Sequence, residues 1–150
     1  MLPATTQAAA REQLLRYYTE TLRILPPELA LTLRHPDLPN AVLHRGVTLP
    51  WNDSDPDNVL EFFTISYWVL GTTPDTCDRY FDLVIRAWEQ QGWPTQTDEN
   101  PRSADTRTPD GYGFTLIQSV NGYLSLSGAT PSFEPDAEEA TPYPTRIDHP

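Results

Sequence analysis

The sequence contains no lysine, and all ten of its basic residues are arginines. The absence of lysine excludes a lysine nucleophile, a Schiff base and capture of phosphate by lysine. Acidic residues number 21, and the formal net charge is −11. Because so acidic a chain repels phosphate backbones, direct binding of nucleic acid is disfavoured. The charge favours solubility, and it also suits a basic protein partner, whose approach it would accelerate.

Cysteine is almost absent as well. A single residue, Cys77, allows neither an intrachain disulfide nor a zinc site of four cysteines. Its place near the start of a predicted helix would favour a reactive thiolate. However, Cys77 shares an apolar helical stripe with Phe81, Val84 and Trp88. We therefore interpret it as a buried core residue, the commoner role of free cysteine.

No long hydrophobic run is present. The longest apolar run is Tyr67–Leu70, far short of the roughly 18–20 residues that span a membrane. Met1 is not followed by the basic flank and apolar stretch of a signal peptide. As it stands, the chain is expected in the cytoplasm; the alternative is an exported protein whose leader has been removed.

What the sequence does contain is enough apolar periodicity for one domain of 150 residues. Helical spacing predicts a first helix over Thr6–Leu25, which the prolines at 26 and 27 end. A second helix is predicted from Thr73 as the N-cap and Pro74 as its first residue. Gly92 follows its last turn, as expected of the residue just beyond a helix C-terminus.

Alternating and β-branched segments predict seven strands. They are Leu29–Leu33, Val42–Leu49, Val59–Leu70, Pro94–Asp98, Ala104–Thr108, Tyr112–Val120 and Tyr123–Ser127. The order α-β-β-β-α-β-β-β-β predicts an α+β fold in which two helices pack on a mainly antiparallel sheet. Asn121-Gly122 predicts a tight hairpin turn between the last two strands.

The C-terminal part differs in composition from the rest. From Ala129 onwards the chain has five prolines and five acidic residues, with few apolar side chains. Such segments cannot bury enough apolar surface to fold. We therefore predict a single domain over residues 1–133 and an acidic, proline-rich, disordered tail over residues 134–150.

The most informative surface lies around the strand Val59–Leu70. Its alternation places Phe63, Ile65, Tyr67 and Val69 on the core face and Phe62, Thr64, Ser66 and Trp68 on the other. If that second face is open, its aromatic residues form a patch suited to a partner or ligand; the alternative is that a helix or loop covers it. An acidic loop precedes the strand, so the candidate binding surface comprises Trp51, Asp53, Asp55, Asp57, Phe62 and Trp68.

No motif predicts a catalytic, cofactor or metal site. Asp53, Asp55 and Asp57 have the spacing of the first calcium ligands of an EF-hand, but Asn58 replaces its glycine and Thr64 its bidentate glutamate. A hydrolase that uses His35 or His44 is conceivable, although neither belongs to a known metal or nucleophile motif. The expectation is a non-enzymatic protein without a cofactor.

The stretch Cys77–Phe133 resembles the C-terminal half of small actinobacterial lipoproteins of the mycobacterial LppA-like kind. In all, the similarity spans roughly residues 11–133 and rests on short features: a tyrosine-phenylalanine helix, a Gly-Trp pair after it, a Thr-Pro-Asp-Gly-Tyr turn and an Asn-Gly hairpin. These features lie at Tyr80–Trp88, Gly92-Trp93, Thr108–Tyr112 and Asn121-Gly122, with Leu124–Leu126 after them.

The resemblance implies a compact α+β domain on the cell envelope, with no catalytic residues to transfer. Two departures count against export: the lipid-bearing cysteine with its leader is absent, and so are the cysteines expected to join the sheet to the following segment, near Ser132. Two binding hypotheses follow. One is a non-catalytic interaction domain associated with the envelope. The other is a cytoplasmic acidic inhibitor of the immunity-protein type, which binds a basic toxin.

Overall fold

The computed structural model describes residues 6–52, 54, 56–57, 59–99, 102–135 and 142–150. Within these ranges it shows two helices and an eight-stranded antiparallel sheet. The elements are α1 (Gln7–Ile24), β1 (Ala30–Thr32), β2 (Val47–Pro50), β3 (Glu61–Leu70), α2 (Cys77–Gln90), β4 (Thr95–Glu99), β5 (Arg102–Arg107), β6 (Gly113–Gln118), β7 (Leu124–Ala129) and β8 (Arg146–Ile147). The predicted α+β class and the predicted order are confirmed, with one further strand at the C-terminal end.

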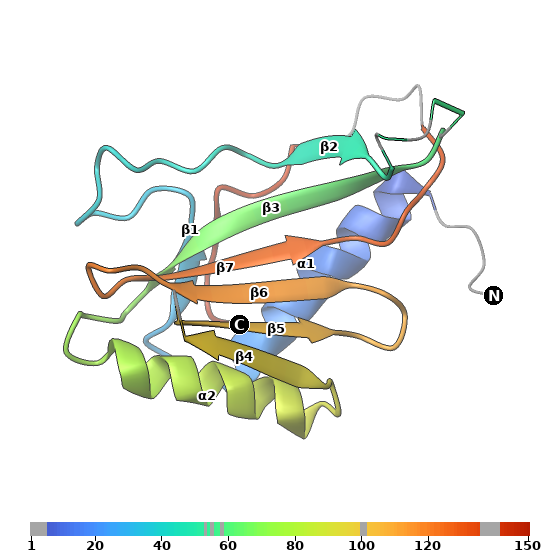
Figure 1. Cartoon of the computed structure of the whole chain (residues 1–150). Coiled ribbons are helices and arrows are strands. Elements are labelled where there is room, and N and C mark those ends of the chain that lie inside the picture. Colours follow the sequence, from blue (N-terminus) through green and yellow to red (C-terminus); the bar gives the residue numbers. More distant parts are fainter. Residues whose placement is uncertain (1–5, 53, 55, 58, 100–101, 136–141) are drawn as a thin grey trace.

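The sheet is organised around the long strand β3. The strand order is β4-β5-β6-β7-β3-β1-β8, and β2 pairs with the first half of β3 on the side where β1 pairs with its second half (Figure 1). Neighbouring strands run antiparallel throughout. Among the described residues, no helix has the length and apolar character needed to cross a membrane.

Both helices pack on the same face of this sheet. In α1 the hydroxyl of Tyr18 donates to the carbonyl of Ile65 at 2.9 Å, and the Tyr18 ring lies 5.2 Å from that of Phe114. In α2 the indole of Trp88 lies 6.5 Å from the same Phe114 ring. Ile65 and Phe114 are core residues of β3 and β6, so one face of the sheet is covered and the other is free of helices.

The second helix begins later than the sequence predicts. The structure places a turn at residues 74–76 and starts α2 at Cys77. The Thr76 hydroxyl accepts the N–H of Thr73 at 2.9 Å, and the Thr76 N–H donates to the Thr73 carbonyl at 3.0 Å. These bonds close a separate turn, so the Thr73 side chain does not cap a helix.

The alternation predicted for the strands is confirmed with one exception. Phe63, Ile65, Tyr67 and Val69 are buried, as are Tyr112, Phe114, Leu116, Leu124 and Leu126. The alternation of the predicted strand Tyr112–Val120 also places Val120 on the inward face with Tyr112, Phe114 and Leu116, but Val120 is fully exposed. The reason is that β6 ends at Gln118 and Val120 lies in the tight turn closed by the bond from the Gly122 N–H to the Ser119 carbonyl.

The prediction of a disordered tail is wrong for residues 142–150, which we call the C-terminal strap. Tyr143 and Ile147 are 4% and 7% exposed, and β8 pairs with β1. The Tyr67 hydroxyl donates to the carbonyl of Pro144 at 2.8 Å. Two buried apolar side chains and the pairing with β1 hold this otherwise polar segment on the domain. Residues 136–141 of the predicted tail lie outside the described residues.

Candidate functional site

The helix-free face of the sheet carries the outward side chains of β3, which are all partly exposed: Phe62, Thr64, Ser66 and Trp68. No described helix covers this face, but its two aromatic residues do not form one patch. Phe62 and Trp68 are six residues apart in one strand, a distance of about 20 Å. The indole N–H of Trp68 also donates to the carbonyl of Ala41 at 2.8 Å, so a loop covers that end of the face.

Phe62 belongs instead to an apolar group at the tip of the β2–β3 hairpin, which we call the hairpin-tip cluster. Its members are Leu49, Trp51 and Phe62, and the exposed Val59 lies next to Leu60, whose carbonyl accepts the Trp51 N–H. Leu49 and Phe62 are direct cross-strand partners. The rings of Trp51 and Phe62 meet edge to face with centroids 5.8 Å apart. Leu49 and Trp51 are 39% and 47% exposed, so the cluster presents apolar surface to solvent.

The surroundings of this cluster are acidic. No basic residue occurs in the hairpin from Val47 to Leu70, whereas four acidic residues do: Asp53, Asp55, Asp57 and Glu61. Of the predicted acidic surface, Asp57 is exposed, while Asp53 and Asp55 lie outside the described residues. Thr64, at the final position of the calcium pattern, lies within β3 and donates its hydroxyl to the Gly128 carbonyl at 3.0 Å.

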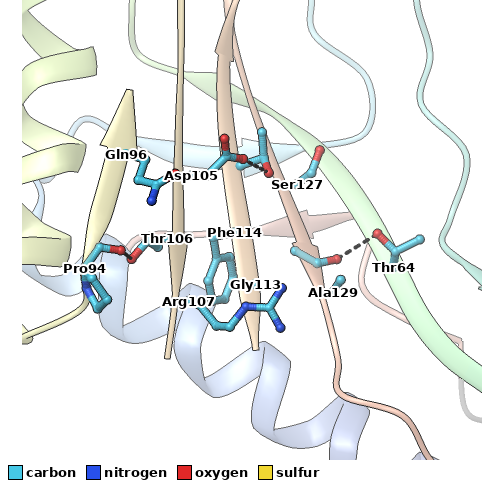
Figure 2. A pocket seen from close by; sticks show the side chains of 12 residues that line it. Thr64, Pro94, Gln96, Asp105, Thr106, Arg107, Gly113, Phe114, Ser127 and Ala129 are labelled. Atoms are coloured by element: carbon cyan, nitrogen blue, oxygen red, sulfur yellow. Dashed lines mark hydrogen bonds between the residues drawn. The ribbon is translucent and has the colours of Figure 1, made fainter. Parts of the chain in front are cut away.

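A second feature of the same face is an open hollow of about 610 Å³ over β5, β6, β7 and β3 (Figure 2). The strand register arranges its lining in rows. One row runs from Arg107 through Gly113 and Ala129 to Thr64. The next row contains Gln96, Asp105, Thr115, Ser127 and Ser66.

The hollow exists because the row from Arg107 to Thr64 has small side chains at its centre. Gly113 and Ala129 lie between Arg107 and Thr64 in that row. The backbone of Gly113 does not have the positive φ that requires glycine. A Cβ placed there would meet no atom closer than the Thr106 carbonyl oxygen, at 4.0 Å. The glycine is thus not needed for the strand, and its missing side chain leaves the hollow open.

The three histidines have different surroundings in the described part of the chain. His35 is buried, its Nδ1 accepts the N–H of Asp37 at 3.0 Å, and its ring contacts that of Tyr123. His44 is exposed, and His149 bonds through Nε2 to the carbonyl of Leu25 at 2.8 Å. No group of three or more histidine, cysteine or acidic residues that could hold a metal occurs among the described residues.

Cys77 is completely buried. Burial raises the pKa of its thiol, and the neighbouring carboxylate of Asp78 raises it further. The complete burial of its side chain in the hydrophobic core confirms the interpretation of Cys77 as a core residue.

No motif in the sequence marks the lining of the hollow. Asp105 and Arg107 alternate with the buried Ala104 and Thr106, and this period of two was available as a signal for an outward polar face. The meeting of these side chains with those of β3 and β7 depends on the strand order. A scan against protein-family models, a search of curated proteins and a search of solved structures each found no match for this chain.

Proposed function

We propose that the chain is a non-catalytic binding domain that recognises a basic protein through its hairpin-tip cluster. The observation that carries this proposal is the exposure of Leu49 and Trp51, 39% and 47%, on a hairpin that contains acidic but no basic residues. Contiguous exposed apolar surface with a polar rim is typical of protein interaction sites.

The two components of this surface have different physical roles. Tryptophan is enriched among the residues that dominate binding energy, because a large rigid ring is desolvated at low entropic cost. The acidic rim attracts a basic partner over a distance and accelerates encounter, and salt screens this attraction. Affinity should therefore depend on Trp51, and the association rate should depend on ionic strength.

The resemblance to actinobacterial lipoproteins supports a place on the cell envelope for this interaction. The acidity of the hairpin supports the alternative, a cytoplasmic inhibitor of the immunity-protein type whose target is a basic toxin. Both proposals use the same surface, and a genomic sequence that encodes a leader or a neighbouring basic effector would distinguish them.

The experiment is a quantitative capture with immobilised protein, comparing the unaltered chain with Trp51→Ala and with Val120→Ala. Val120 is the matched control because it is a fully exposed apolar residue in a different hairpin. We expect a basic protein to be retained by the unaltered chain and by Val120→Ala. Loss of an interface tryptophan should weaken its binding by at least about 2 kcal/mol, measured with the purified partner by calorimetry.

Two results would contradict the proposal. One is a captured partner with an acidic surface, or with an affinity insensitive to salt. The other is equal retention by Trp51→Ala and Val120→Ala, which would place the interface elsewhere.

A further inference from the structure

The hollow on the open face is distinct from the hairpin-tip cluster. Several of its hydroxyl groups already donate their hydrogens to other groups of the protein. The Thr115 hydroxyl donates to the Asp105 carboxylate at 2.7 Å, and the Thr64 hydroxyl donates to the Gly128 carbonyl at 3.0 Å (Figure 2). Each of these hydroxyl hydrogens is therefore used within the protein, while the oxygen lone pairs remain as acceptors.

The hydroxyl groups of Thr115 and Thr64 form a wall of the hollow that is rich in acceptors, and the carboxylate of Asp105 adds further acceptors to it. The bond from Thr115 reaches only its Oδ1 atom, and an ionised carboxylate accepts up to about four hydrogen bonds. Beside it, the hydroxyls of Ser66 and Ser127 are 2.6 Å apart and share one hydrogen bond. One of their two hydrogens remains as a donor, so a ligand on this wall must be mainly a hydrogen-bond donor.

Arg107 requires the opposite from a ligand, namely groups that accept hydrogen bonds. Its exposed guanidinium has no hydrogen bond or ion pair with any other described residue, and it is the only cationic side chain in the lining. A guanidinium carries five N–H donors in a fixed fork and no acceptor. Figure 2 shows the Arg107 side chain beside Gly113, at one end of the row that leads to Ala129 and Thr64. A ligand must offer acceptors at this place.

The opposite charges of Asp105 and Arg107 restrict the net charge that a ligand of the hollow can carry. Asp105 and Arg107 are two residues apart on the same face of β5, about 7 Å. An anion bound at Arg107 would meet the Asp105 carboxylate within a chain of net charge −11. A cation bound at Asp105 would meet the guanidinium. A neutral ligand whose groups both donate and accept avoids both conflicts.

We propose that this hollow binds a neutral saccharide. Sugar hydroxyls donate and accept at once, so neighbouring hydroxyls can donate to Asp105, Thr115 and Thr64 and accept from Arg107. The volume of about 610 Å³ lies within the range of small-molecule sites. The absence of a side chain at Gly113 provides the room that a sugar ring needs. This site is separate from the proposed protein interface.

The test is a titration of the ¹⁵N-labelled protein with maltose, cellobiose and N,N′-diacetylchitobiose, followed by amide chemical shifts. We expect saturable shifts with at least one disaccharide, centred on Gly113, Thr115, Ser127 and Ala129. Gly113→Val fills the hollow, and Arg107→Gln removes the charged donor without disturbing a described hydrogen bond. Each should weaken binding at least about tenfold, as expected for loss of a hydrogen bond to a charged group or of the space for the ligand.

Ser103→Val is the matched control, because Ser103 lies on the same face of β5 but outside the hollow. It should change the affinity less than about twofold, and Trp51→Ala should likewise leave saccharide binding intact. If Gly113→Val fails to fold, Arg107→Gln decides the question. The proposal is overturned if no disaccharide shifts these amides, if inorganic phosphate or acetate binds there instead, or if Arg107→Gln binds the sugar unchanged.

Discussion

Gly71 and Gly92 end β3 and α2 with their backbones in the left-handed region, at φ +93° and +80°. Their surroundings differ. A Cβ at Gly71 would overlap the backbone carbonyl of Glu28, whereas a Cβ at Gly92 would meet nothing within 4 Å. At Gly92 glycine serves the backbone conformation alone. At Gly71 it also permits the close approach of the segment that leads into β1.

We therefore expect Gly71→Ala to destabilise the protein more than Gly92→Ala. An L-residue in the left-handed conformation costs about 1–2 kcal/mol at either position. Only Gly71→Ala adds a clash with backbone, which should increase its cost by at least about 1 kcal/mol. Urea unfolding of the two variants measures the difference. Equal losses would show that the Glu28 segment moves freely away from β3.

At the scale of the elements, the C-terminal strap is held by side chains from several parts of the fold. The Tyr143 ring lies 4.9 Å from that of Phe63, and its hydroxyl donates to the carbonyl of Arg11 at 2.7 Å. The Arg45 side chain donates through Nε to the Tyr143 carbonyl at 2.7 Å. The strap thus joins α1, β3 and the loop before β2, and it forms part of the folded domain.

Tyr143→Ala should lower the free energy of unfolding by about 3 kcal/mol, because it leaves a cavity where a buried aromatic ring was. Tyr143→Phe should cost only about 1 kcal/mol, the contribution of one hydrogen bond. Thr145→Ala, at an exposed position of the same strap, should stay within about 0.5 kcal/mol. Urea unfolding provides the comparison, and a stability unchanged in Tyr143→Ala would mean that the strap does not pack as the structure shows.

For the molecule as a whole, tyrosine supplies much of the buried aromatic surface and also sets the response to alkali. Burial raises the pKa values of Tyr18, Tyr67 and Tyr143, and it raises the pKa of Tyr112 to about 12. In the unfolded chain these phenols ionise near pH 10. Above that pH the folded state holds more protons than the unfolded state, so stability falls as pH rises.

The stabilisation from these tyrosines should be complete below pH 10 and should decline as the pH rises through the interval from 10 to about 12, the pKa of folded Tyr112. Melting temperatures recorded across this interval should therefore fall steadily. Tyr112→Phe, which removes one of the raised phenols, should show a shallower fall than the unaltered protein. A melting temperature independent of pH in both proteins would be inconsistent with neutral, buried phenols.

Much of the architecture follows from local patterns. The period-two alternation in β3 correctly separates its core face from its open face, because successive side chains of any strand point to opposite sides. The helices follow from apolar spacing and from the prolines that end α1. In the candidate site, the exposed Trp51 and its neighbour Phe62 could likewise be identified from aromatic residues beside an acidic loop.

The tertiary structure alone decided the rest. Whether Trp68 is open depended on the loop carbonyl of Ala41, which is distant in sequence. The burial of Tyr143 depended on its packing against Phe63, which the composition of the tail does not indicate. The hollow required Arg107, Gly113, Ala129 and Thr64, from four strands, to come into one row. The sequence by itself determined which side chains each strand turns outward. The strand order and register determined which of them meet, because these are set by contacts between segments far apart in the chain.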